Sequence, residues 1–73
     1  MNFGLAVQVM RTVRGMTQND LAAAAGINRS IIWQIESGLV IPGPELEQTI
    51  KAALRWPARA DEAFAILEGD DAN

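Results

Sequence analysis

The chain has 73 residues, so it can form one small domain with a limited core, since a domain of this size buries only about 60 to 65% of its unfolded surface. It contains no cysteine and no histidine, which excludes disulfides, thiolate metal sites and imidazole-based catalysis. Six basic and nine acidic residues give a net charge of −3. The acidic excess lies in residues 38–73, so residues 1–37 are the only part suited to binding a polyanion.

The chain is predicted to be all-α, with five short helices, because tyrosine is absent and apolar residues recur at spacings of three and four throughout. The first helix is expected from Phe3 to Arg14, with Gly15 ending it in a left-handed conformation. Its buried stripe consists of Phe3, Val7 and Met10. A second apolar stripe makes this helix more apolar than one buried face requires, and it consists of Leu5, Val9 and Val13.

The next two helices are short and nearly adjacent. Thr17 is a suitable N-cap for the second helix, with Asp20 at the capping-box position, and Gly26 closes it. Asn28 is the expected N-cap of the third helix, which ends at Gly38. The apolar side of that helix consists of Ile31, Ile32 and Ile35. Two short helices joined by a turn that contains Gly form a helix-turn-helix pattern.

Prolines mark the fourth helix. Pro42 and Pro44 hold the preceding loop out of helix, Pro44 can serve as the first helical residue, and Pro57 is expected to end the helix. The face predicted to be buried consists of Leu46, Ile50, Ala53 and Leu54.

The fifth helix is predicted around residues 60–67, where Ala60, Ala63, Phe64 and Leu67 recur at helical spacing. We expect a single domain over residues 1–68 and an acidic tail at residues 69–73 that frays. The apolar N-terminus lacks a basic leader, and Arg11 interrupts it before it reaches membrane-spanning length, so a cytoplasmic location is expected.

The chain resembles the helix-turn-helix domains of phage repressors and Cro-like transcription regulators. The resemblance runs from "FGLAVQVMRTVRG" through "TQNDLAAAAGI", "IESG" and Pro42 to "IKAAL", which is about three quarters of the sequence. The matching residues are Phe3, Gly4, Val7, Met10, Arg11, Arg14, Gly15, Thr17, Gln18, Leu21, Ala22, Gly26, Ile27, Ile35, Glu36 and Gly38. The resemblance implies a compact five-helix, repressor-like fold that needs no cofactor. It also implies a homodimer that places two reading helices about 34 Å apart on a palindromic operator in double-stranded DNA.

Under the resemblance, the third helix reads base edges with its outward residues Arg29, Ser30 and Gln34. Arg can bind guanine in a bidentate fork, Gln can do the same with adenine, and Ser can bond either. The alternative, an ordinary solvated helix face, is less favoured inside this motif. Backbone phosphates are expected to meet Gln18, Asn28 and Ser37. Gln18 is also expected to buttress Arg29, and for Asn28 the capping role fits equally well.

Arg11 and Glu36 match positions that form a buried or half-buried ion pair in the family, which implies a structural role. Trp33 lies beside the reading residues and has three open roles. It could pack on a thymine methyl, form a subunit contact, or cover Ala23 and Ala24 on the second helix. We favour the last.

The chain departs from the family where relatives carry basic residues after the third helix, because it has Leu39, Val40 and Ile41 there. Together with the second stripe of the first helix, these residues suggest a protein interface and weak non-specific DNA binding. The fifth helix is where a dimer contact is expected, through Phe64, Ile66 and Leu67. Ile66 lies off the main stripe, which gives it a reason to be in an interface; the alternative is that it is ordinary surface.

Two functions therefore compete. The first is a sequence-specific transcriptional regulator, a repressor or Cro-like switch, located in the cytoplasm and associated with the nucleoid when bound to DNA. The alternative is a protein-interaction module on the same fold, such as an antitoxin, antirepressor or complex subunit. No enzyme is expected, because no nucleophile with a base and no phosphate-binding loop is present.

Overall fold

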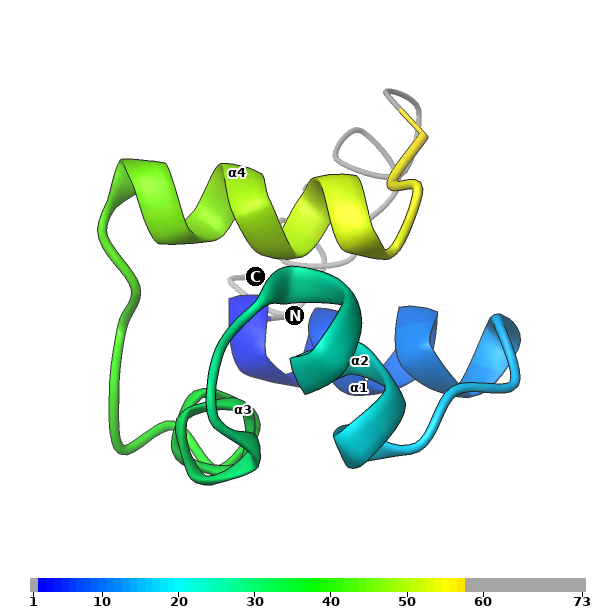
Figure 1. Ribbon diagram of the computed structural model, residues 1–73. Coiled ribbons are helices and arrows are strands. Elements are labelled where there is room, and N and C mark those ends of the chain that lie inside the picture. Colours follow the sequence, from blue (N-terminus) through cyan, green and yellow to red (C-terminus); the bar gives the residue numbers. More distant parts are fainter. Residues whose placement is uncertain (1, 58–73) are drawn as a thin grey trace, which may run out of the picture.

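The computed structural model describes residues 2–57, which form four α-helices and no strand (Figure 1). Helix α1 spans Phe3–Val13, α2 spans Gln18–Ala25, α3 spans Arg29–Glu36 and α4 spans Pro44–Ala53. The all-α prediction is therefore correct for the described residues. None of these helices is long and apolar enough to cross a membrane. The predicted fifth helix and acidic tail lie outside the described residues, as do the candidate interface residues Phe64, Ile66 and Leu67.

The helices begin at residues suited to capping. Asn2 Oδ1 accepts a hydrogen bond of 2.8 Å from the Leu5 N–H at the start of α1. Thr17 and Asp20 form the predicted capping box, with bonds of 3.0 Å from the Asp20 N–H to the Thr17 hydroxyl and 2.9 Å from the Thr17 N–H to the Asp20 carboxylate. Helix α4 starts at Pro44, as predicted. Local sequence therefore sets where these helices start.

Asn28 stands at the expected N-cap position of α3, but its side chain makes no capping hydrogen bond. The N–H of Ile31, which an N-cap side chain ordinarily binds, donates instead to the Asn28 carbonyl at 3.1 Å. The expected side-chain capping role is therefore absent, and the exposed Asn28 amide stays available to other partners.

Helix α2 ends in a turn that requires a left-handed residue. Gly26 has φ +70°, its N–H donates to Ala23 O at 3.3 Å, and the Ile27 N–H donates to Ala22 O at 3.0 Å. This Schellman-type end reverses the chain within three residues and delivers it to α3. It produces the sharp turn that a helix-turn-helix unit needs.

Helix α4 ends earlier than predicted, at Ala53 rather than at the residue before Pro57. Arg55 adopts φ +51°, and the Trp56 N–H donates back to Lys51 O at 2.9 Å, which closes the same type of helix end without glycine. A left-handed conformation costs a non-glycine residue roughly 1–2 kcal/mol, so other contacts must hold it. Arg14 supplies them, because its guanidinium donates to Leu54 O at 3.0 Å and to Arg55 O at 2.9 Å.

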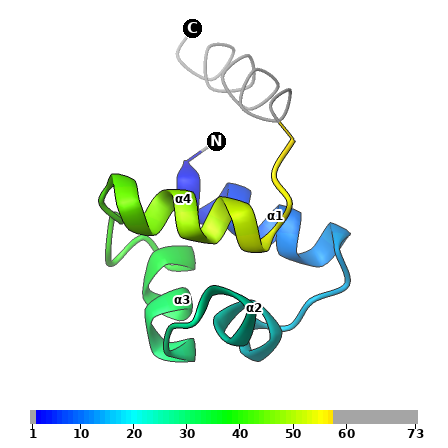
Figure 2. The same ribbon diagram turned by 45° about the horizontal axis from the view of Figure 1, so that its top comes forward.

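The core lies where the four helices meet. Helix α2 contacts both α3 and α4, and α1 contacts α3; both ribbon views place α3 and α4 on opposite sides of the molecule (Figure 2). The buried core cluster is apolar throughout and consists of Val7, Met10, Leu21, Ala22, Ile32, Ile35, Ile50 and Leu54. The predicted stripe of α1 therefore faces the core, while Leu5 and Val13 of the second stripe are exposed. The core therefore holds α3 by its buried isoleucine side and leaves the opposite side of the helix in solvent.

Candidate nucleic-acid interface

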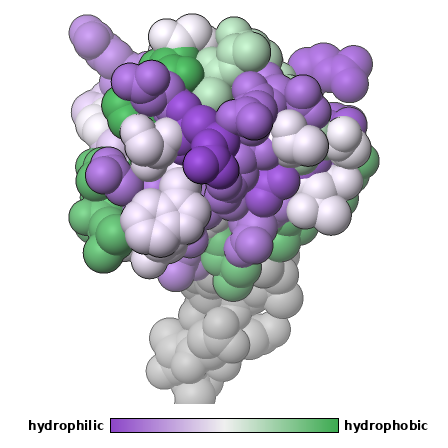
Figure 3. Space-filling model, turned by 60° about the horizontal axis from the view of Figure 1, so that its bottom comes forward, coloured by the Kyte–Doolittle hydropathy of each residue, from purple (hydrophilic) through white to green (hydrophobic). Residues whose placement is uncertain are grey.

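The exposed side of α3 presents polar residues. Ile32 and Ile35 are buried, which turns the opposite side outward, since residues follow each other at about 100° around a helix. Arg29 and Ser30 are exposed, and Gln34 is partly exposed on the same side. The surface around α3 and the start of α2 is mainly hydrophilic at its centre, with hydrophobic side chains toward its edges (Figure 3).

Arg11 in α1 and Glu36 at the end of α3 form an ion pair. Arg11 Nε donates to Glu36 Oε2 at 2.8 Å and Arg11 Nη2 donates to Glu36 Oε1 at 3.1 Å, in a bidentate arrangement. The two side chains retain only 16% and 5% of their exposed surface. Arg11 Nη1 also donates to Met16 O at 2.9 Å. The hydrogen bonds to Glu36 raise the pKa of Arg11 above its ordinary value. The bidentate contact ties α1 to α3.

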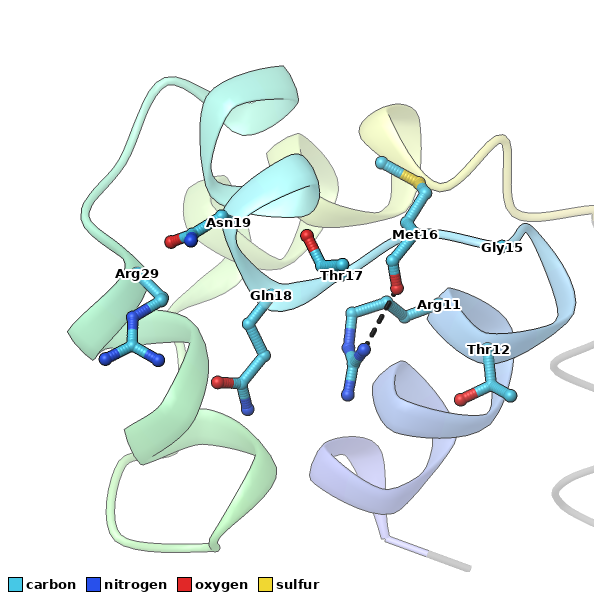
Figure 4. A pocket seen from close by; sticks show the side chains of 8 residues that line it. All are labelled: Arg11, Thr12, Gly15, Met16, Thr17, Gln18, Asn19 and Arg29. Atoms are coloured by element: carbon cyan, nitrogen blue, oxygen red, sulfur yellow. Dashed lines mark hydrogen bonds between the residues drawn. The ribbon is translucent and has the colours of Figure 1, made fainter.

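Gln18, the first residue of α2, joins this pair. Its Nε2 donates to Glu36 Oε1 at 3.1 Å, so the carboxylate receives bonds from two helices. The expected support of Arg29 by Gln18 is not seen as a hydrogen bond, since the two residues share none within residues 2–57. Figure 4 shows Gln18 between Arg29 and Arg11, with its amide directed to the same side as Arg29. Gln18 thus positions the start of α2 relative to α3.

A hollow opens beside these residues, between the end of α1 and the starts of α2 and α3 (Figure 4). Two of its polar lining residues, Thr12 and Asn19, were not singled out by sequence reasoning. They carry no motif, and the turn between α1 and α2, which also lines the hollow, brings them to this edge. The start of a helix attracts anions, although the Asp20 carboxylate in the first turn of α2 offsets part of that field.

Free positive charge is sparse in the first three helices, because two of the three arginines in residues 2–37 already form hydrogen bonds within the protein. Arg11 is bound to Glu36, and Arg14 is bound to the carbonyls that follow α4. Arg29 has no hydrogen-bond or ion-pair partner among the described residues and remains exposed. Residues 2–57 contain five basic and four acidic side chains, so the acidic excess of the chain lies beyond residue 57.

The remaining predicted positioning residues, Asn28 and Ser37, are both exposed. They stand at the two ends of α3, as its N-cap and its C-cap. Phosphate contacts at both positions would place the helix along a groove.

Apolar side chains are exposed at two further places. Leu5 and Val13 lie on α1, where Val9 between them is partly buried. The loop after α3 exposes Leu39, Val40 and Ile41, the last at 90% of its surface. Both sets coincide with the interface residues expected from the sequence, and nothing in residues 2–57 covers them.

Trp33 is 51% exposed on α3. Ala23 and Ala24 of α2 are exposed as well, so Trp33 does not bury them as sequence reasoning favoured. The other two roles considered for it stay open at this point.

A family model described as helix-turn-helix matches residues 10–50, which is more than half of the chain. The matched segment begins in α1, contains all of α2 and α3, and reaches into α4. No curated protein and no solved structure matches the chain significantly.

Proposed function

Because the chain belongs to the helix-turn-helix family of DNA-binding regulators, we propose that it is a sequence-specific transcription regulator that reads the major groove with α3. The observation that carries this proposal is the geometry of α3. Its buried isoleucines fix the helix from behind, and Arg29 and Ser30 point into solvent without intramolecular hydrogen bonds among the described residues. An α-helix fits the major groove of B-form DNA, so these side chains can reach base edges.

The three outward residues of α3 recognise different bases. Arg29 stands at the first position of the helix, where recognition helices meet bases, and its free guanidinium suits guanine O6 and N7. Gln34 suits adenine N6 and N7, and Ser30 accepts either base. A bidentate contact of this kind discriminates by about 1–3 kcal/mol against the wrong base.

Phosphate contacts flank the reading face. Gln18 and Asn19 at the start of α2 lie beside Arg29 at the hollow, and Asn28 and Ser37 mark the two ends of α3. Neutral amides and hydroxyls orient the protein on the duplex without adding charge. Position along the groove therefore depends on hydrogen bonds more than on cations.

The regulator acts as a homodimer, repressor or Cro-like, that occludes a promoter at a palindromic operator in the cytoplasm. Two copies of α3 one DNA turn apart, about 34 Å, give the operator its symmetry. The domain extends over residues 1–68, and its action requires no cofactor and no catalytic step.

Selection of bound duplexes from a random library at about 50 mM salt tests this function, because electrostatic attraction still aids a weak binder there. We expect a palindrome with G and A at matched half-site positions, bound by two subunits in sedimentation. The double variant Arg29→Ala, Gln34→Ala should lose that affinity. Gln48→Ala, at an exposed position of α4, is the matched control and should keep the operator affinity. Unchanged binding by the double variant would refute the assigned reading face.

The exposed apolar residues of α1 and of the loop after α3 favour a second function, a protein-interaction module on the same fold. In that case folded protein enriches no duplex by itself, and a partner covers these residues, as in an antitoxin, antirepressor or complex subunit. Tight DNA binding by the pure protein, unchanged by Val13→Lys and Ile41→Lys, argues against it.

A further inference from the structure

Trp33 lies in the middle of the face that the proposed function assigns to DNA. Arg29 precedes it by about one turn and Ser37 follows it by about one turn, so all three share one side of α3. At about 100° per residue, Trp33 falls between Arg29 and Ser30 around the helix. It places a large apolar ring among polar residues that are themselves exposed.

The ring has no structural role that accounts for its position. Trp33 is absent from the core cluster and from the partly buried side chains packed against it. The aromatic contacts recorded for residues 2–57 involve Phe3, Lys51 and the other tryptophan, Trp56. A tryptophan usually buries its ring and pairs its N–H, whereas half of the Trp33 surface remains in solvent.

We propose that Trp33 is a specificity-determining residue that packs against the C5-methyl group of a thymine in the operator. This inference rests on the proposed function. The thymine methyl is the apolar group that bases present in the major groove, and apolar side chains recognise it by contact. The position of Trp33 places this thymine between the bases read by Arg29 and Gln34.

The neighbours of Trp33 favour DNA over a second subunit as the partner. A protein interface has an apolar core from which charge is depleted, whereas the exposed residues about one helical turn from Trp33 are Arg29, Ser30 and Ser37. Burying these residues against protein would leave several polar groups to be paired. In the major groove the same groups meet base edges and phosphates, and the indole N–H can donate to an acceptor there.

Single replacement of each operator thymine by deoxyuridine tests the proposal, because it removes only the methyl group. Wild-type protein should lose about fourfold in affinity at one position of each half-site, the value of one buried methyl. Trp33→Ala should bind the thymine and deoxyuridine duplexes equally. Trp33→Phe keeps an apolar ring and should retain sensitivity to the methyl. Gln48→Ala, at an exposed position of α4 outside the proposed DNA-binding face, should respond like wild type.

Failure of this proposal is distinct from failure of the proposed function. If folded wild-type protein selects no duplex, both are wrong. If a selected duplex is bound and no thymine is sensitive, or if Trp33→Ala keeps the sensitivity, only the role of Trp33 is wrong. A Trp33→Ala variant that changes the oligomeric state and leaves the methyl effect intact identifies a subunit contact and also overturns the proposal.

Discussion

Gly4 in α1 lies directly against the backbone carbonyl of Ile35 in α3, and a Cβ atom at Gly4 would collide with that oxygen. Gly4 is buried, and the atoms that it meets are backbone atoms, which cannot rotate away as a flexible side chain could. The absence of a side chain at this position therefore sets how closely α1 approaches the proposed recognition helix.

Gly4→Ala should lower the free energy of unfolding by about 1–3 kcal/mol or more, because adding a methyl to a packed contact forces the helices apart. Chemical denaturation measures the loss. Gly43→Ala is the matched control, since a Cβ at Gly43 meets no atom within 4 Å and its φ is −70°. Equal stability of the two variants would show that the α1–α3 contact tolerates displacement.

Removing one partner of the Arg11–Glu36 pair should lower the free energy of unfolding more than replacing both partners with apolar residues. Glu36→Ala leaves the Arg11 charge largely buried without its partner and should lower stability by about 3–5 kcal/mol. The double variant Arg11→Met, Glu36→Leu removes both charges and should recover much of that loss. Urea midpoints at constant m-value report both effects. The surface pair Glu47–Lys51, separated by 3.3 Å, is the control, and Glu47→Gln should cost less than about 1 kcal/mol.

Arg14→Met should destabilise the end of α4 by about 1–3 kcal/mol, because it removes two charge-assisted hydrogen bonds to carbonyl groups. Amide hydrogen exchange localises the effect. The Trp56 N–H should exchange faster, whereas the Ile27 N–H, which makes the equivalent bond at the end of α2, should not change. Equal acceleration at both amides would indicate global unfolding rather than loss of a local clamp.

Sequence alone predicted the features of the fold that depend on neighbouring residues. Thr17 and Asp20 carry the whole signal for the start of α2 within four positions, and Gly26 marks its end. The end of α4 was missed because it depends on Arg14, which is 40 positions away from Leu54. Nothing near Arg55 in the sequence signals a left-handed residue.

In the candidate site as well, some features follow from helical spacing and others depend on how the helices pack. Helical spacing alone placed Ser30 on the side of α3 opposite Ile32, and in the structure Ser30 is exposed while Ile32 is buried. Spacing could not reveal that Gln18 binds Glu36 rather than Arg29, since that choice depends on how α2 crosses α3. Spacing also could not show that the guanidinium groups of Arg11 and Arg14 form hydrogen bonds within the protein.

The capping box of α2 should make stability depend on acid. Hydrogen bonding from Thr17, first from its backbone N–H, lowers the pKa of Asp20 below the ordinary 3.8. The unfolded chain therefore takes up this proton more readily, so the stabilisation is complete above 3.8 and is lost as pH falls through the lower folded-state pKa. The difference in unfolding free energy between wild type and Asp20→Asn, measured by urea denaturation, should shrink as the pH falls from 3.8 through the lower folded-state pKa of Asp20. A constant difference would mean that the charge of Asp20 does not stabilise the cap.

The sparse free cations should give DNA binding a shallow dependence on salt. Each neutralised phosphate contributes about 0.9 to the slope of log affinity against log salt concentration, and Arg29 is the unengaged arginine beside the hollow among the described residues. Leu39→Lys places a cation just after α3 and should steepen the slope by about 0.9 per subunit. Gln48→Lys adds the same charge on α4, on the opposite side of the molecule, and should leave the slope nearly unchanged. Equal steepening by both variants would mean that net charge, rather than position next to the reading helix, controls binding.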